Sequence, residues 1–251
     1  MKSGRSPGRP ASVQRGRLGA YVWWQGRDFL RRGLVILLFG LVGGYGLVTV
    51  ARQHGMTTLD LVPNAIILAV VKGVAWLGVL MATAGLVSSE RKSGEYRMLF
   101  VKPIRIPAFY AQRYVVHLLG LLLCIAVLDG MLWWGGLQLP CVWVLEYVTL
   151  VYLTLGGVSF LLSTFLLYDW GVVTLLWIGA PIVYTWAARA TTPVRWVVYL
   201  LPPSHRLAEI AQAFSEASLT HAWRPLLWLV AYGLTCFGLG LVILWRRPFA
   251  S

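Results

Sequence analysis

The sequence predicts an all-α membrane protein with six transmembrane helices, on three observations. Of its 251 residues, 58% are hydrophobic and only 12% are charged, the mean hydropathy is +0.70, and the apolar residues gather in six long stretches. Such a composition does not fit one soluble core with a polar shell. Each stretch has about the ~20 residues that a helix needs to cross a bilayer, and open strand edges cannot face lipid. The predicted spans are residues 33–51, 65–87, 114–134, 142–167, 172–188 and 226–245.

The segment before the first span divides in two. Residues 1–17 are rich in Gly, Ser, Pro and Arg and predict a disordered basic tail. Residues 18–32 mix aromatic and aliphatic residues with arginines, which favours an amphipathic helix lying on the cytoplasmic leaflet. The alternative is a simple cytoplasmic extension of the first span. Residues 18–251 are expected to form a single transmembrane domain.

A secretory signal peptide is the competing interpretation of the first span, because a basic segment precedes it and small residues end it. The nineteen residues 33–51 exceed the usual signal core of about 7–15 apolar residues. We therefore expect a membrane helix here.

The basic residues of the loops predict the orientation. With the N-terminus inside, sixteen of the 22 Lys and Arg residues fall on the cytoplasmic side, so the positive-inside rule places both termini in the cytosol. The net charge of +13 follows from this topology and from attraction to anionic lipid head groups, so no nucleic acid is expected as a partner. The sixteen are Lys2, Arg5, Arg9, Arg15, Arg17, Arg27, Arg31, Arg32, Arg91, Lys92, Arg97, Lys102, Arg105, Arg113, Arg246 and Arg247.

No residues in the sequence form a recognisable chemical centre. Cys124, Cys141 and Cys236 lie in or beside apolar spans without paired spacing, so neither a metal site nor a disulfide is expected. No Gly-x-x-x-x-Gly-Lys-Ser/Thr phosphate loop occurs, so ATP, if it is used, must bind to another polypeptide. We expect no catalytic residues and no cofactor in this chain.

The segment between the fifth and sixth spans is predicted to carry short helices at the outer interface. A Pro202-Pro203 break precedes a stretch in which apolar residues recur at i, i+3, i+4 and i+7, opposite polar residues. An ordinary surface helix is the alternative. The apolar positions are Leu207, Ile210, Ala211 and Phe214, and the polar ones are Glu209, Gln212 and Glu216.

Residues 88–103 form a charged island between the second and third spans. Ser93 can cap a short helix with Glu95 in its first turn, and Pro103 prevents its continuation. A helix with an apolar face and charges of both signs can dock on a soluble partner. A solvated turn is the simpler alternative.

The island and the residues that follow it resemble the export-type (type 2) permease subunits of ABC transporters. The sequence Ser-Glu-Arg-Lys-Ser-Gly-Glu-Tyr-Arg-Met-Leu is followed by Pro-Ile-Arg and by Tyr-Ala-Gln-Arg at the third span. The order of spans, the amphipathic N-terminal segment and the outer helices extend the resemblance over most of the chain. The sequence departs from the family pattern at Lys92, Glu95-Tyr96 and Phe100-Val101. The matching positions are Glu90, Arg91, Gly94, Leu99, Pro103 and Arg113.

The resemblance implies a transmembrane subunit of an exporter in a prokaryotic plasma (inner) membrane. The large apolar walls of the spans, with few inward charges, favour a lipid-like, amphipathic or glycan-lipid substrate over a small ion. A separate nucleotide-binding ATPase subunit would bind ATP and Mg²⁺, and a second copy of this chain or a related permease would complete the transporter. A membrane anchor or assembly subunit without transport activity is the alternative. The coupling helix that contacts the ATPase would comprise Glu90, Arg91, Gly94, Glu95, Tyr96, Arg97 and Leu99.

Three ionisable residues predict a charge cluster in the outer third of the bundle. Charges within a membrane are costly and tend to face a bundle interior or water. Lys72 is therefore expected to pair with Asp129 or Glu146. The alternative is that Lys72 extends to the outer interface while the acids contact water.

Two smaller patterns have both functional and structural interpretations. Gly40-x-x-x-Gly44 has the spacing of helix pairing, either between subunits or within one chain. Ser159 follows Gly157-Val158 as in an intramembrane serine protease, but the only later histidines, His205 and His221, lie in the outer segment, which argues against that enzyme class.

Overall fold

A computed structural model describes residues 11–53, 64–93, 106–134, 141–166, 169–189, 201–215 and 223–246, and these residues contain helices and no strand. Within them, six helices are long and apolar enough to cross a membrane, which confirms the predicted number. These candidate spans are Val22–Gly46, Val71–Glu90, Ile106–Trp134, Cys141–Phe165, Asp169–Ala187 and Trp223–Arg246.

The first helix differs from the prediction. α1 is a single helix, Ala11–Gln53, so residues 18–32 are not a separate interfacial element and the helix already includes the last residues of the predicted tail. No proline occurs between Ala11 and Gln53 to interrupt it. At about 1.5 Å per residue its 43 residues span about 64 Å, roughly twice the ~30 Å hydrocarbon core. The alternative of an extension of the first span therefore describes α1 better.

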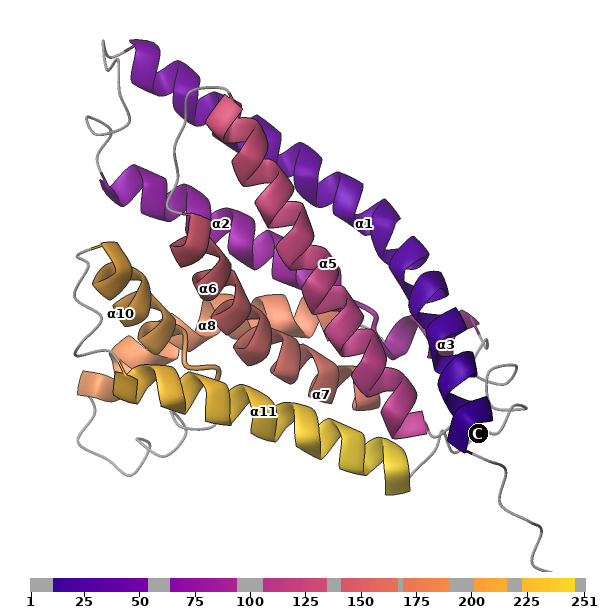
Figure 1. Cartoon of the computed structure of the whole chain (residues 1–251). Helices are drawn as coiled ribbons and strands as arrows, with labels where there is room; N and C mark the ends of the chain where they lie inside the picture. Colours follow the sequence, from indigo (N-terminus) through magenta and orange to yellow (C-terminus); the bar gives the residue numbers. More distant parts are fainter. Residues whose placement is uncertain are drawn as a thin grey trace, which may run out of the picture.

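α5 (Ile106–Trp134) lies beside α1 over much of its length (Figure 1) and also packs on α2, α6 and α11. α2 (Asn64–Thr83) runs behind them and is followed after a turn by the short α3 (Ser88–Ser93). The fourth span consists of α6 (Cys141–Val151), the π-helical segment η2 (Tyr152–Gly156) and α7 (Gly157–Phe165). The fifth and sixth are α8 (Asp169–Arg189) and α11 (Trp223–Arg246).

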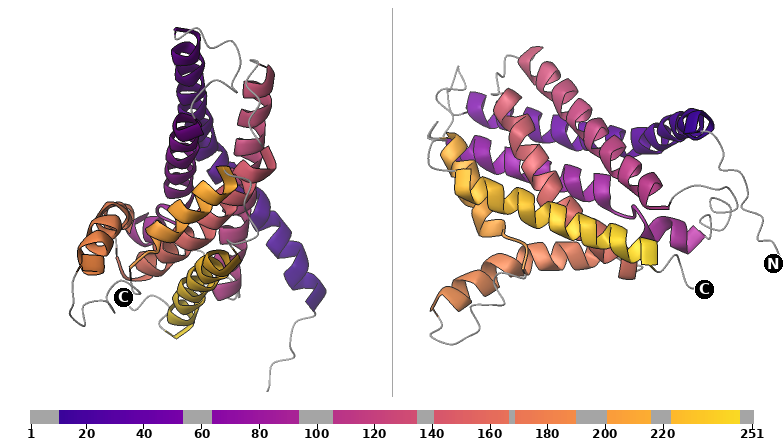
Figure 2. Two further views of the ribbon diagram at one scale, coloured as in Figure 1. Left: turned by 90° about the vertical axis from the view of Figure 1, so that its left-hand side faces the viewer. Right: turned by 60° about the horizontal axis from the view of Figure 1, so that its bottom comes forward.

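The bundle has two distinct ends. The start of α1, the end of α11 and α3 lie at one end, and the start of α2, the start of α6 and α10 (Ser204–Ser215) lie at the other (Figures 1 and 2). We call these the α3 end and the α10 end. In the predicted orientation the α3 end is cytoplasmic.

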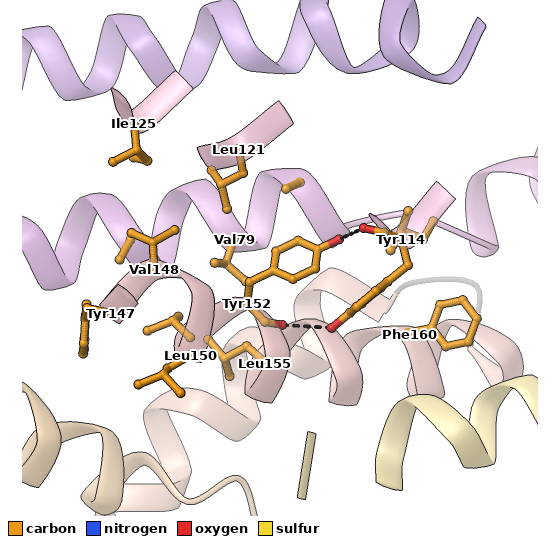
Figure 3. Packing of buried hydrophobic residues seen from close by; sticks show 14 of the residues in the cluster. Val79, Tyr114, Leu121, Ile125, Tyr147, Val148, Leu150, Tyr152, Leu155 and Phe160 are labelled. Carbon is orange, nitrogen blue, oxygen red and sulfur yellow. Dashed lines mark hydrogen bonds between the residues drawn. The ribbon is translucent and has the colours of Figure 1, made fainter. Parts of the chain in front are cut away.

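The core centres on two tyrosines from the third and fourth spans. The Tyr114 hydroxyl donates to the Tyr152 carbonyl at 3.1 Å, and the Tyr152 hydroxyl donates to the Tyr114 carbonyl at 2.7 Å (Figure 3). Tyr152 opens the π-helical segment, whose wider turn leaves backbone groups without their usual α-helical partners. The reciprocal bonds fix α5 to this segment, and Phe160 packs against Tyr114.

Glycines let neighbouring helices approach closely. A β-carbon on Gly233 of α11 would collide with the Leu153 carbonyl, and one on Gly157 would collide with the Gly233 carbonyl. On α1, side chains on Gly40 and Gly44 would collide with leucines of α5. The Gly40-x-x-x-Gly44 spacing thus serves packing within the chain.

α10 confirms the predicted amphipathic helix between the fifth and sixth spans. Its residues Leu207, Ile210 and Ala211 are buried, and Glu209 and Gln212 are exposed. The buried face packs on α8, α11 and α6. The structure does not describe residues 190–200, where a second outer helix was predicted.

Candidate functional site

The candidate site is the turn at which α2 ends and α3 begins. Gly85 has a φ of 74°. This left-handed conformation commonly ends a helix, and glycine adopts it without steric cost because it has no β-carbon. The last carbonyls of a helix lack partners within that helix. Here the Thr83 carbonyl accepts from the Leu86 amide at 3.3 Å, and side chains of other helices satisfy neighbouring carbonyls.

Basic side chains from α1 and α5 bond these carbonyls. Arg32 of α1 donates to the Ala84 carbonyl at 2.6 Å and to the Met81 carbonyl at 3.4 Å. His117 of α5 donates through Nδ1 to the Ala82 carbonyl at 2.6 Å. The positive charge of Arg32 is favourable at the C-terminal end of a helix, where the helix dipole is negative.

Arg113 of α5 bonds both the turn and the start of α3. Its Nη1 donates to the Leu86 carbonyl at 3.1 Å and forms an ion pair with Glu90. Arg113 is 3% exposed and Glu90 is 2% exposed, so the pair is buried. The Tyr110 hydroxyl donates to the other Glu90 oxygen at 2.6 Å. A buried ion pair is stabilised when further hydrogen bonds satisfy its remaining atoms. These contacts satisfy both Glu90 oxygens and both terminal nitrogens of Arg113, whereas Arg113 Nε is buried without a partner among the described residues.

Two more acids connect α1 and α8 to the same turn. Asp28 of α1 accepts from Arg113 Nη2 at 3.2 Å and lies 3.8 Å from Arg32 Nη2. Asp169, the first residue of α8, accepts from the Gly85 amide at 3.1 Å and from the Ser88 hydroxyl at 2.9 Å. The turn is therefore bonded to three other helices, α1, α5 and α8. We call this set of contacts the clamp; its side chains are Asp28, Arg32, Ser88, Glu90, Tyr110, Arg113, His117 and Asp169.

The clamp is suited to fixing a backbone rather than to chemistry. Its acids and bases are joined to one another or to backbone groups at hydrogen-bond distance, and only Arg113 Nε and His117 Nε2 of its buried side-chain atoms have no partner among the described residues. In the part of the chain that the structure describes, no cluster of three His, Cys, Asp or Glu residues could hold a metal ion. The arrangement holds the exit of α2 in a fixed position relative to three helices.

The clamp bears on the predicted coupling residues. Glu90 was expected to face a partner, but its side chain is buried and bonded within the chain. Arg91 lies in α3, whose last residue is Ser93. The other predicted contacts, Gly94, Glu95, Tyr96, Arg97 and Leu99, lie outside the described residues.

The structure does not bring the predicted charge cluster together. None of the ion pairs among the described residues joins Lys72 to Asp129 or Glu146. Lys72 lines a cavity between α2, α6, α8 and α10, whereas Asp129 lines a separate apolar pocket between α1, α2, α5 and α6. Glu146 is exposed. Ser159 is buried on α7, and its hydroxyl has no hydrogen-bond partner among the described residues.

Sequence reasoning missed most of the clamp. A signal was present, because Asp28, Arg32, Arg113 and Asp169 all lie near the predicted cytoplasmic ends of apolar helices. Residues in such positions are usually counted toward topology, and nothing in the sequence shows which of them meet.

Comparison of the chain with models of protein families, with curated proteins and with solved structures found no match.

Proposed function

We propose that this chain is the membrane-spanning permease subunit of an ABC-type exporter, driven by a separate ATPase subunit. The observation that carries the proposal is the buried pair between Glu90 and Arg113. These residues are two of the positions on which the sequence resemblance rests, and they lie twenty-three residues apart on different helices. Their pairing fixes the point at which the predicted coupling segment leaves the bundle.

The clamp suggests how force would pass from the ATPase to the membrane helices. ATP and Mg²⁺ would bind to the partner, and closure of the partner would displace the segment after Ser93. If the end of α2 were not bonded to other helices, it would bend and absorb this displacement. Because α1, α5 and α8 bond the turn directly, a displacement would instead move these helices together, as rigid-body transitions of packed helices require.

This proposal gives Glu90 a different role from the one first predicted. Glu90 anchors α3 within the chain, and the direct contacts to the ATPase fall on the residues that follow. The proposed contact residues are Arg91, Gly94, Glu95, Tyr96, Arg97 and Leu99.

The proposed transporter pairs this chain with a second copy or a related permease in a prokaryotic plasma membrane, with both termini in the cytoplasm. The start of α1 and the end of α11 lie at the same end of the bundle (Figure 1), as this topology requires. The apolar walls of the bundle favour a lipid-like, amphipathic or glycan-lipid substrate over a small ion.

Copurification tests the proposal directly. The complex is isolated from its native membrane in mild detergent, and ATPase activity is measured with Glu95→Arg/Arg97→Glu and with the intact sequence. The matched control is Arg206→Glu/Glu209→Arg, which reverses an exposed ion pair on α10 at the other end of the bundle. We expect an ATPase subunit to copurify with the intact chain and the control but not with the first variant.

Two outcomes would contradict the proposal. Absence of any ATPase from the intact complex would favour the anchor or assembly class. Loss of the ATPase from both double variants would show that charge reversal acts on the chain as a whole and not through the coupling segment.

A further inference from the structure

The fourth span changes its helical form part of the way along its length. α6 ends at Val151, η2 continues as a π-helix over Tyr152–Gly156, and α7 resumes the α-helical form at Gly157. All three segments belong to one candidate span, Cys141–Phe165. π-Helical turns are rare, and where they interrupt an α-helix they commonly mark a functional position or a bend.

The part of the span that follows α6 is fixed to the sixth span. α11 lies along η2 and α7 and contacts α6 much less. The backbones touch at two glycines, because a β-carbon on Gly233 would collide with the Leu153 carbonyl and one on Gly157 would collide with the Gly233 carbonyl. η2 and α7 therefore stay with α11, and the contact at Gly233 is a fulcrum at the base of α6.

α6 has room to move relative to that fixed part. Protein interiors are otherwise close-packed, but Tyr147 and Val151 of α6 line a cavity of about 270 Å³ that separates them from Trp177 of α8. The 11 residues of α6 span about 16 Å at 1.5 Å per residue, so a tilt of about 15° at η2 moves its far end about 4 Å. The cavity lets α6 tilt toward α8.

Hydroxyl groups hold the junction in its present position. Tyr114 of α5 donates to the Tyr152 carbonyl at 3.1 Å and accepts from the Tyr152 hydroxyl at 2.7 Å through its own carbonyl (Figure 3). The Thr154 hydroxyl donates to the Leu150 carbonyl at 2.8 Å, and bonds of this kind bend helices. Tyr114 and Tyr152 are both buried. Water cannot readily replace their bonds inside a membrane, so the two bonds act as a latch between α5 and the junction.

We propose that η2 is a joint in the fourth span, at which α6 tilts into the cavity while α7 stays on α11. The two hydrogen bonds between Tyr114 and Tyr152 hold the joint in the position described here. The inference goes beyond the proposed function and needs no ATPase, so either can fail without the other.

Distances between pairs of spin labels, measured by double electron–electron resonance, test the joint. One pair is placed at Val142 of α6 and Ile182 of α8, which are both exposed, in a chain whose three native cysteines are replaced by alanine. We expect one main distance in the intact sequence and a second population, about 4 Å shorter, in Tyr114→Phe. Loss of one hydrogen bond should raise the ratio of the shorter to the main population roughly fivefold. Tyr152→Phe removes the other bond and should have the same effect, which keeps the test decisive if one variant does not fold.

Two controls separate the joint from general loosening. Labels at Phe165 of α7 and Leu239 of α11, both exposed, should keep one distance in every variant. Tyr147→Phe removes a hydroxyl from α6 without touching the latch and should leave both pairs unchanged.

Filling the cavity should prevent the motion. Ala208 of α10 is exposed and lines the cavity, so Ala208→Phe combined with Tyr114→Phe should remove the shorter population. Identical Val142–Ile182 distances in the intact chain and in both tyrosine variants would overturn the proposal. An equal change in the Phe165–Leu239 pair would also overturn it, as would a shorter population that persists when the cavity is filled.

Discussion

Replacing Arg113 by methionine should destabilise the protein more than any other single change in the clamp. Arg113 bonds the buried Glu90, the Leu86 carbonyl and Asp28. Removing one partner of a buried ion pair costs about 3–5 kcal/mol, because the other charge is left uncompensated. The Asp28 carboxylate is 39% exposed, so its pair with Arg113 adds only about 0–1 kcal/mol. The loss of Glu90's partner therefore dominates.

The assay is thermal unfolding of the detergent-solubilised chain. The quantity measured is the fraction of protein that stays monodisperse after heating. For a domain of 150–250 residues, 1 kcal/mol shifts Tm by about 2–4 °C, so Arg113→Met should melt on the order of 10 °C lower. Arg206→Met is the control, because the Arg206–Glu209 pair is 44% and 50% exposed and contributes about 0–1 kcal/mol. Arg113→Lys should fall between the two, since one ammonium cannot bond Glu90, Asp28 and the carbonyl together.

A double variant separates the ion pair from general packing. Glu90→Gln combined with Arg113→Met removes both charges and should be more stable than Arg113→Met alone, because no unpaired charge remains buried. If Arg113→Met unfolds at the same temperature as the unchanged protein, or if the double variant loses the sum of the two single losses, the clamp is not the anchor that we describe.

Three further changes test the packing of the bundle and the outer helix by the same assay. Gly233→Ala places a β-carbon against the π-helical backbone and should cost about 1–3 kcal/mol, whereas Gly238→Ala meets no atom within 4 Å and should stay within about 0.5 kcal/mol. Gly85→Ala should cost about 1–2 kcal/mol because of its φ of 74°. Burial, and to a lesser extent a neighbouring arginine, lowers the pKa of His205, whose ring stacks on Tyr184. Folding thus favours neutral His205, so its contribution to the free energy of unfolding is complete above pH ~6.5 and is lost as pH falls through the folded pKa. This pH dependence should be absent in His205→Gln. An unchanged dependence of Tm on pH in that variant would exclude this explanation.

The spans could be predicted from the sequence because the bilayer imposes a length and a composition that each helix must meet by itself. The amphipathic face of α10 was predictable for the same reason, since its period is local. The continuity of α1 could not be predicted, because an amphipathic segment before a span has the same sequence pattern whether the chain bends there or continues as one straight helix. The π-helical turn at Tyr152 is set by contacts with α5 and α11 and has no sequence signal.

The clamp could not be predicted because it depends on which charges meet. Glu90 belongs to a motif whose neighbours are charged and hydrophilic, so an exposed position was the reasonable expectation. Its partner Arg113 lies beyond the island, at the start of the next span, and Asp28 comes from α1. Pairing across helices depends on tertiary geometry, which local sequence patterns do not contain.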